Sequence, residues 1–360
     1  MSALSSLWTT ISTWVQHPAA KYFYHPIARD HVENPQYAEG PLEAGVHYFR
    51  LWLTEMYLKN DHVWFVDRHP AVHSFVRFQF GTKVVEIPYL AGEFKLQGLN
   101  SNNLDRVIAL NYPLTALMPF NGGVVELMAG LVSMKGNGSL KSFIKVVEDF
   151  SALLNVPQFS TALSVAEPVA SGVQELLGGA NGELRLGLHQ TYTGAGGGGA
   201  NVLSPGYIAV VMADATQLPK DQLYVSADRL RFGPSLAQST SFTGYDYILL
   251  RVEGRTARDD MEGLTSIEEP RQRALDALAK GQKEVAQHEL SLAQAAAINC
   301  PELTRADRRR TFAGLKQEFE EMGGAGAVPG PALALGELIE RVMPVDQALA
   351  LGEPTMAELS

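Results

Sequence analysis

The segment from residue 61 to residue 73 carries the histidines with the clearest capacity for chemistry. It contains His62, His69 and His73, together with two aspartates. Imidazole and carboxylate groups can ligate a divalent metal or transfer protons. Pro70 interrupts any helix that would place His69 and His73 on one face, so a helical metal pair is not expected. In the favoured interpretation, these histidines lie in a solvated loop. In the alternative, they form a site that distant carboxylates complete.

Asp259 and Asp260 are the carboxylates that would complete such a site. They follow a predicted strand and stand among Arg255, Arg258 and Glu262. Paired carboxylates at a strand end can serve a hydrolase or bind a divalent cation. Charges of alternating sign this close together are more typical of a solvated surface. A hydrolase or metal-dependent enzyme therefore stays the second hypothesis.

A glycine tract at residues 194–199 matches the dinucleotide-binding pattern GxGxxG. That pattern cradles a pyrophosphate only where a strand precedes the glycines and a helix begins on them. A strand is predicted up to Tyr192, but residues 207–213 read as another strand rather than a helix. The sequence therefore predicts an inter-strand loop here and no bound cofactor.

The single cysteine, Cys300, excludes an internal disulfide and a multi-cysteine zinc site. No metal is therefore predicted.

The first residues have the period of an amphipathic helix. Leu7, Trp8, Ile11 and Trp14 gather on one helical face, and serines and threonines occupy the other faces. The favoured interpretation is a helix packed on the chain's own core. The same four residues are the candidate interaction residues if the helix binds a partner. Insertion at a membrane interface is the third interpretation, although such helices usually carry Lys or Arg and none precedes Lys21.

The elements further along predict an α+β fold, mainly an antiparallel β-sandwich with a helical insertion and a helical C-terminal region. Short segments rich in aromatic and branched residues follow one another without helices between them, which is typical of antiparallel sheets. Among them, residues 73–80 and 83–87 are predicted to form a hairpin, and residues 222–232 a single strand. A second amphipathic helix is predicted over residues 43–58. The expected organisation is N-terminal helices and an irregular arm (1–61), the sandwich (62–255) with its insertion (139–178), a helical region (256–322), and a linker with a flexible tail (323–360).

Residues 271–298 resemble a single tetratricopeptide-like helical hairpin. Gly281, Ala286 and Ala293 match the glycine of that family's hairpin and the alanines five and twelve positions later. The resemblance implies a pair of antiparallel helices, of the kind that binds peptides when it is stacked in arrays. Because the sequence shows no second copy, one helical hairpin is predicted.

Composition narrows the function classes. The chain has 360 residues, 46% of them hydrophobic, and 39 acidic residues against 29 basic ones give a net charge of −10. This balance argues against a nucleic-acid partner, whose binding depends on phosphate neutralisation. No transmembrane helix is expected. The expected location is cytoplasmic. The preferred hypothesis is a non-catalytic protein-interaction or assembly module of an intracellular complex, with peripheral membrane attachment through residues 3–16 as a further alternative.

Overall fold

The chain forms two compact units. The first comprises residues 1–41, 50–116 and 123–254, and the second residues 42–49, 117–122 and 255–360. The computed structural model describes residues 3–16, 22–59, 62–63, 66–80, 83–92, 107–135, 168, 171–172, 174, 182–194, 201–214, 216–258, 261–323 and 333–359. The helical insertion predicted over 139–178 lies almost wholly outside these residues.

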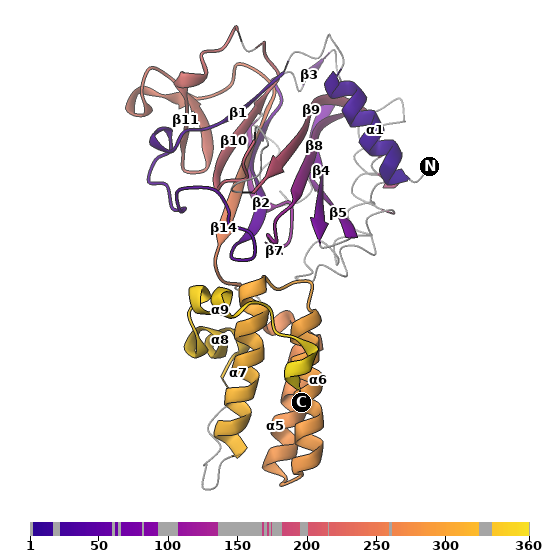
Figure 1. Cartoon of the computed structure of the whole chain (residues 1–360). Coiled ribbons are helices and arrows are strands. Elements are labelled where there is room, and N and C mark those ends of the chain that lie inside the picture. The colour runs from indigo at the N-terminus through magenta and orange to yellow at the C-terminus, as the bar shows by residue number, and fades with distance from the viewer. Residues whose placement is uncertain are drawn as a thin grey trace. The chain divides into compact units, whose positions relative to one another are not determined.

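Two antiparallel sheets make up most of the first unit, and the predicted α+β fold is confirmed (Figure 1). One sheet has the order β1-β10-β14-β2-β6. In the other, β4 pairs with β5 and β8, β8 pairs with β9, and β3 pairs with the start of β4. The strands are β1 (Phe23–Pro26), β2 (Tyr48–Tyr57), β3 (His62–Val63), β4 (Val66–Phe80), β5 (Lys83–Gly92), β6 (Val107–Pro113), β7 (Met118–Pro119), β8 (Val124–Lys135), β9 (Gly182–Thr193), β10 (Gly206–Val211), β11 (Leu223–Ser226), β12 (Arg229–Phe232), β13 (Thr240–Ser241) and β14 (Tyr247–Arg255).

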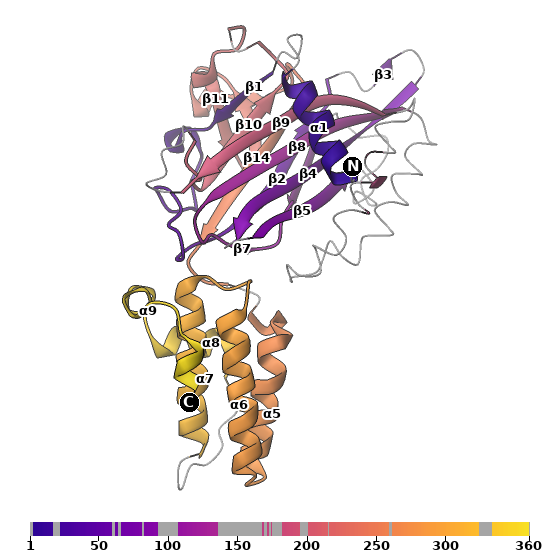
Figure 2. The same cartoon turned by 45° about the vertical axis from the view of Figure 1, so that its right-hand side comes forward.

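Helix α1 (Ala3–Gln16) covers the outer face of the sheet that contains β4, β8 and β9, and it packs on β9 and β8 (Figure 2). The sheets also contact each other directly, because Tyr192 on β9 donates a hydrogen bond of 3.0 Å to the Tyr24 hydroxyl on β1. As a result β8 is covered on both faces: neighbouring residues such as Met128 and Ala129, which point to opposite sides, are both fully buried. The apolar run of β8 follows from this double coverage.

The sheet that contains β10, β14 and β2 is covered by the N-terminal arm, which includes Ile27 and Val32, and by a small sheet, β11-β12-β13. Apolar residues of β10 and β14, such as Val211 and Leu249, pack there against Leu223 and Leu230 of the small sheet. Glu55 on β2 is 2% exposed in this region and accepts a hydrogen bond of 2.7 Å from the Leu230 amide. Burial raises the pKa of the Glu55 carboxyl, although the bonds from Leu230 and from the Tyr247 hydroxyl oppose that rise.

This buried carboxyl predicts a pH dependence of stability. A carboxyl with a raised pKa in the folded state holds its proton more tightly than in the unfolded chain. The free energy of unfolding should therefore be highest below the ordinary carboxyl pKa and should fall as pH rises through the raised value. Glu55→Gln should remove this part of the decline. Urea denaturation from about pH 3 to about pH 8 measures it, because this range extends to both sides of the ordinary carboxyl pKa. A variant that loses stability with pH as steeply as the wild type would contradict the assignment.

The second unit is helical. A hairpin of α5 and α6 packs with α7, and the predicted hairpin over 271–298 is confirmed. Gly281 lies in its bend with φ of +72°, and Ala286 and Ala293 are fully buried. The unit's core includes Ile267 and Leu303. Its helices are α5 (Thr265–Ala279), α6 (Lys283–Asn299), α7 (Arg305–Gly323), α8 (Leu335–Val342) and α9 (Val345–Leu351). No helix in the part of the chain that the structure describes is long and apolar enough to cross a membrane.

Three sequence predictions differ from the structure. The helix predicted over 43–58 is wrong, because the segment from Tyr48 is strand β2. Residues 53–57 of this central strand are all buried, which hides the two-residue period in its second half. The single strand predicted over 222–232 is a hairpin, turned by Ala227 and Asp228 with φ of 50° and 61°. The tail expected to be loosely held contains α9 and a 3-10 turn, and Arg309 of α7 bonds the Glu358 carboxylate.

Candidate functional site

The three candidate histidines lie on two neighbouring strands, β3 and β4. The two that share β4 are far apart along it. His69 and His73 both belong to β4, where four residues of extended chain separate their backbones by about 13 Å. The backbone of His62 on β3 pairs with Asp67 of β4. This spacing is that of a strand rather than the single helical turn of an i,i+4 metal pair. Nothing is described of these three side chains.

The remaining chemical candidates do not form a described site. Asp259 and Asp260 lie outside the described residues, as do residues 195–199 of the glycine tract. After the tract, Asn201 to Pro205 contain no helical turn and the strand β10 follows, as predicted. Among the residues that the structure describes, no group of three His, Cys, Asp or Glu side chains could hold a metal ion. Cys300 is buried, and burial raises the pKa of its thiol, which disfavours the nucleophilic thiolate.

Two of the four candidate interaction residues of α1 have described side chains, and both face the sheet. Leu7 is fully buried and Trp8 is 6% exposed, so the interpretation of a helix packed on the chain's own core holds for these two. The Arg77 guanidinium lies over the Trp8 ring, 4.2 Å from the ring centroid. The Trp8 and His189 rings meet edge-on, with 5.4 Å between their centroids. Ile11 and Trp14 belong to the same helix, and their side chains are outside the description.

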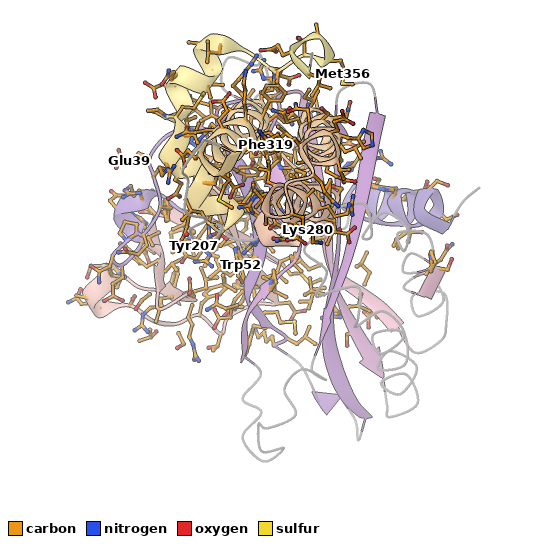
Figure 3. The ribbon with its side chains drawn as sticks, turned by 90° about the horizontal axis from the view of Figure 1, so that it is seen from below. Glu39, Trp52, Tyr207, Lys280, Phe319 and Met356 are labelled. Carbon is orange, nitrogen blue, oxygen red and sulfur yellow. The ribbon has the colours of Figure 1, made fainter. Side chains whose placement is uncertain are left out.

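A row of arginine and aromatic side chains crosses the first unit. Its centre is Arg251 on β14, whose guanidinium lies 5.1 Å from the Trp52 ring centroid on β2. Arg251 is also the cross-strand partner of Tyr207 on β10 and hydrogen-bonds its hydroxyl. Figure 3 shows Trp52 and Tyr207 on these strands. We call the following six residues the arginine–aromatic row: Arg29, Tyr37, Tyr207, Arg251, Trp52 and Arg50.

Further arginine and aromatic side chains extend the row at both ends. Tyr37 packs edge-on against Tyr207 with 6.2 Å between ring centroids, and the Arg29 guanidinium lies 4.9 Å from the Tyr37 ring. At the other end, the Arg50 guanidinium lies 5.5 Å from Trp52. Cation–π and edge-to-face contacts of this kind hold flat side chains in fixed orientations. The row is therefore a preorganised surface rather than a set of separate mobile side chains.

Acidic groups fix the row further. The Glu253 carboxylate accepts a hydrogen bond of 2.6 Å from the Trp52 indole and lies 3.9 Å from Arg50. The Tyr207 hydroxyl donates to Asp228, and burial together with that bond raises the pKa of Tyr207. Tyr207 therefore stays protonated at neutral pH and acts as a hydrogen-bonding group, not as a base.

The chemistry of the row is that of binding. Five of its six residues are partly exposed, and Tyr207 beneath Tyr37 is 8% exposed. Its side chains present aromatic faces and guanidinium donors, and none of them is a nucleophile poised beside a general base. Such a surface can stack on, and hydrogen-bond to, a second molecule.

The row is not apparent from the sequence, because the strand that contains Arg50 and Trp52 was predicted to be a helix. Arg50 and Trp52 alternate with the buried Phe49, Leu51 and Leu53, which is the period of a strand. The helix prediction over the same segment obscured that alternation. Comparison of the chain with models of protein families, with curated proteins and with solved structures finds no match.

Proposed function

We propose that this protein is a non-catalytic protein-interaction or assembly module and that its partner contacts the arginine–aromatic row. The observation that carries the proposal is the contiguous contact series from Arg29 to Arg50, which passes through Arg251 and three aromatic side chains. Trp, Tyr and Arg are the residues that dominate the binding energy of protein interfaces. Flat side chains held in place before binding lose little conformational freedom when a partner docks.

Charge supports a protein partner rather than a nucleic acid. Arg29 pairs with Glu39 at 3.0 Å and Arg50 lies near Glu253, so the row is close to neutral. A nucleic-acid surface would need uncompensated cations, and the chain as a whole carries a charge of −10. A cytoplasmic complex is part of the proposal and rests on the single buried cysteine.

The enzyme alternative would need the histidines of β3 and β4 to meet Asp259 and Asp260. Its test is a metal determination on the purified protein, followed by assay of His69→Ala for lost metal. Stoichiometric zinc that disappears in this variant would favour the enzyme over the interaction module.

Trp52→Ala is the direct test of the row. Trp52 contacts both Arg50 and Arg251, so its removal should disorder the two guanidinium groups as well as delete its own contact area. We expect affinity for the partner to fall by about thirtyfold, corresponding to a hot-spot loss of about 2 kcal/mol. The partner is first captured by a photocrosslinking amino acid placed at position 38, beside Tyr37, and is then purified for calorimetry with each variant.

The matched control is Val285→Ser, which changes an exposed apolar residue of α6 in the other unit. Unchanged affinity in this control, with Trp52→Ala still folded by circular dichroism, would assign the loss to the row. Equal affinity of Trp52→Ala and wild type would contradict the proposal. A loss caused by Val285→Ser alone would move the interface to the helical hairpin.

A further inference from the structure

Two consecutive arginines of α7, Arg308 and Arg309, lie on a stretch of helix that offers them no acidic residue at pairing distance. The positions three and four residues before and after each arginine hold neither Asp nor Glu, and these are the positions that meet on a helix surface. The two side chains are nevertheless only 14% and 11% exposed. Residues 351–359, which we call the acidic segment, supply carboxylate groups to both arginines.

The Arg309 guanidinium binds this segment as an arginine binds a peptide. It donates to both oxygens of the Glu358 carboxylate, at 2.6 and 3.3 Å, which is the two-pronged geometry that arginine favours. It also donates to the carbonyl oxygens of Gly352 and Glu353, each at 2.9 Å, and lies 3.5 Å from that of Leu351. Within the described part of the chain, all hydrogen bonds of this guanidinium go to the acidic segment.

Two carboxylates of the segment are held in place for this contact. Glu353 lies 3.6 Å from the Arg308 guanidinium. Glu358 accepts a hydrogen bond of 2.7 Å from the Thr355 amide in addition to those from Arg309. The bonds from Arg309 and Thr355 lower the pKa of Glu358 to about 2, so its carboxylate stays ionised at neutral pH. The segment therefore presents two charged groups that are five positions apart in the sequence.

Polar contacts, rather than buried apolar surface, hold the acidic segment. The structure describes all nine of its residues; only Pro354 among them is buried, and Leu359 is partly buried. Met356 contacts Asn299 of α6 but is 57% exposed, and Leu351 is 56% exposed. Ion pairs with exposed carboxylates stabilise a structure weakly, and little apolar surface leaves water here. A second peptide with the same acceptor groups can therefore compete for the arginines.

We propose that Arg308 and Arg309 form a binding site for an acidic peptide segment of a partner protein, and that residues 351–359 occupy this site in the free protein. The partner's segment would offer two carboxylates five residues apart and accessible backbone carbonyls beside the first. Arginine clusters recognise acidic motifs by such bonds. The site belongs to the second unit, whereas the arginine–aromatic row crosses the first.

The probe for this site is a fluorescent peptide with the sequence of residues 351–359, acetylated and amidated so that its ends carry no charge. Fluorescence anisotropy follows its binding to the whole protein. In the wild type the tethered segment competes at a high effective concentration. Glu353→Gln combined with Glu358→Gln removes the carboxylates of the tethered segment, so the peptide should bind at least about tenfold more tightly. Both glutamates are exposed, at 44% and 40%, so the double variant should stay folded.

Arg309→Ala in the double-variant background should weaken peptide binding at least about tenfold, because it removes the bonds to one carboxylate and two carbonyls. Glu358→Gln in the peptide should have an effect of similar size. The matched control is Arg341→Ala, which removes an exposed arginine of α8 that pairs with Glu321. This control should leave peptide binding unchanged. Binding should also weaken as salt is added, since both ionic partners are near the surface.

Three outcomes overturn the site. If the double variant is folded by circular dichroism but binds no peptide, the arginines hold the segment only as a part of the fold. If the wild type and the double variant bind the peptide equally, the peptide contacts a different surface. If binding survives Arg309→Ala, or if Arg341→Ala weakens it as much, the peptide responds to the general charge of the unit.

Discussion

Arg271→Ala is expected to destabilise the helical unit by about 3–5 kcal/mol, the typical effect of breaking a buried ion pair from one side. Arg271 on α5 has a side chain only 3% exposed, and it bonds both carboxylate oxygens of Glu318 on α7, at 2.6 and 2.7 Å. It also bonds Glu268 and the Leu333 carbonyl. The variant would leave the carboxylate of Glu318, itself 8% exposed, buried without its cation.

The measurement is urea denaturation followed by circular dichroism, which reports the helices. All four tryptophans lie in the first unit, so their fluorescence follows the sandwich separately. Arg273 on the same helix is the matched control: its side chain is 53% exposed and it pairs with Glu289 at 2.8 Å. Arg273→Ala should cost less than about 1 kcal/mol. Similar losses in the two variants would contradict the prediction.

Tyr48→Phe is expected to destabilise the same unit by about 1–3 kcal/mol, because it leaves buried polar groups without a partner. The Tyr48 side chain is fully buried; its hydroxyl donates to the Asp307 carboxylate at 2.6 Å and accepts from the Thr304 amide at 3.2 Å. Burial raises the pKa of Asp307, and the bonds from Tyr48 and Arg310 oppose that rise. Removing the hydroxyl should therefore raise the pKa of Asp307 further.

A double-mutant cycle with Asp307→Asn checks this assignment. If the two side chains interact as the geometry indicates, the combined variant should lose less stability than the sum of the single variants, with a coupling of about 0.5–3 kcal/mol. Strict additivity in urea denaturation would mean that the hydroxyl and the carboxylate contribute independently. Tyr24→Phe serves as a control for tyrosine truncation in general, because its hydroxyl lies in the other unit.

Local patterns were sufficient wherever an element has one clear period. The alternation through Phe80 and Lys83 predicted the hairpin of β4 and β5, whose register places those two residues opposite each other. Gly281, Ala286 and Ala293 likewise predicted the bend and packed face of one helical hairpin. In these elements the residues that make contact are near in sequence, so their spacing carries the information.

The amino-acid sequence by itself determined the antiparallel α+β class, the amphipathic face of α1 and the helical hairpin. Only the tertiary structure decided that residues 48–57 form a central strand, because the consecutive burial of residues 53–57 leaves the alternation that distinguishes a strand from a helix confined to residues 49–53. It also decided the arginine–aromatic row. Trp52, Arg251 and Tyr207 meet through the order of β10, β14 and β2, and the pairing of distant strands is a property of the whole sheet.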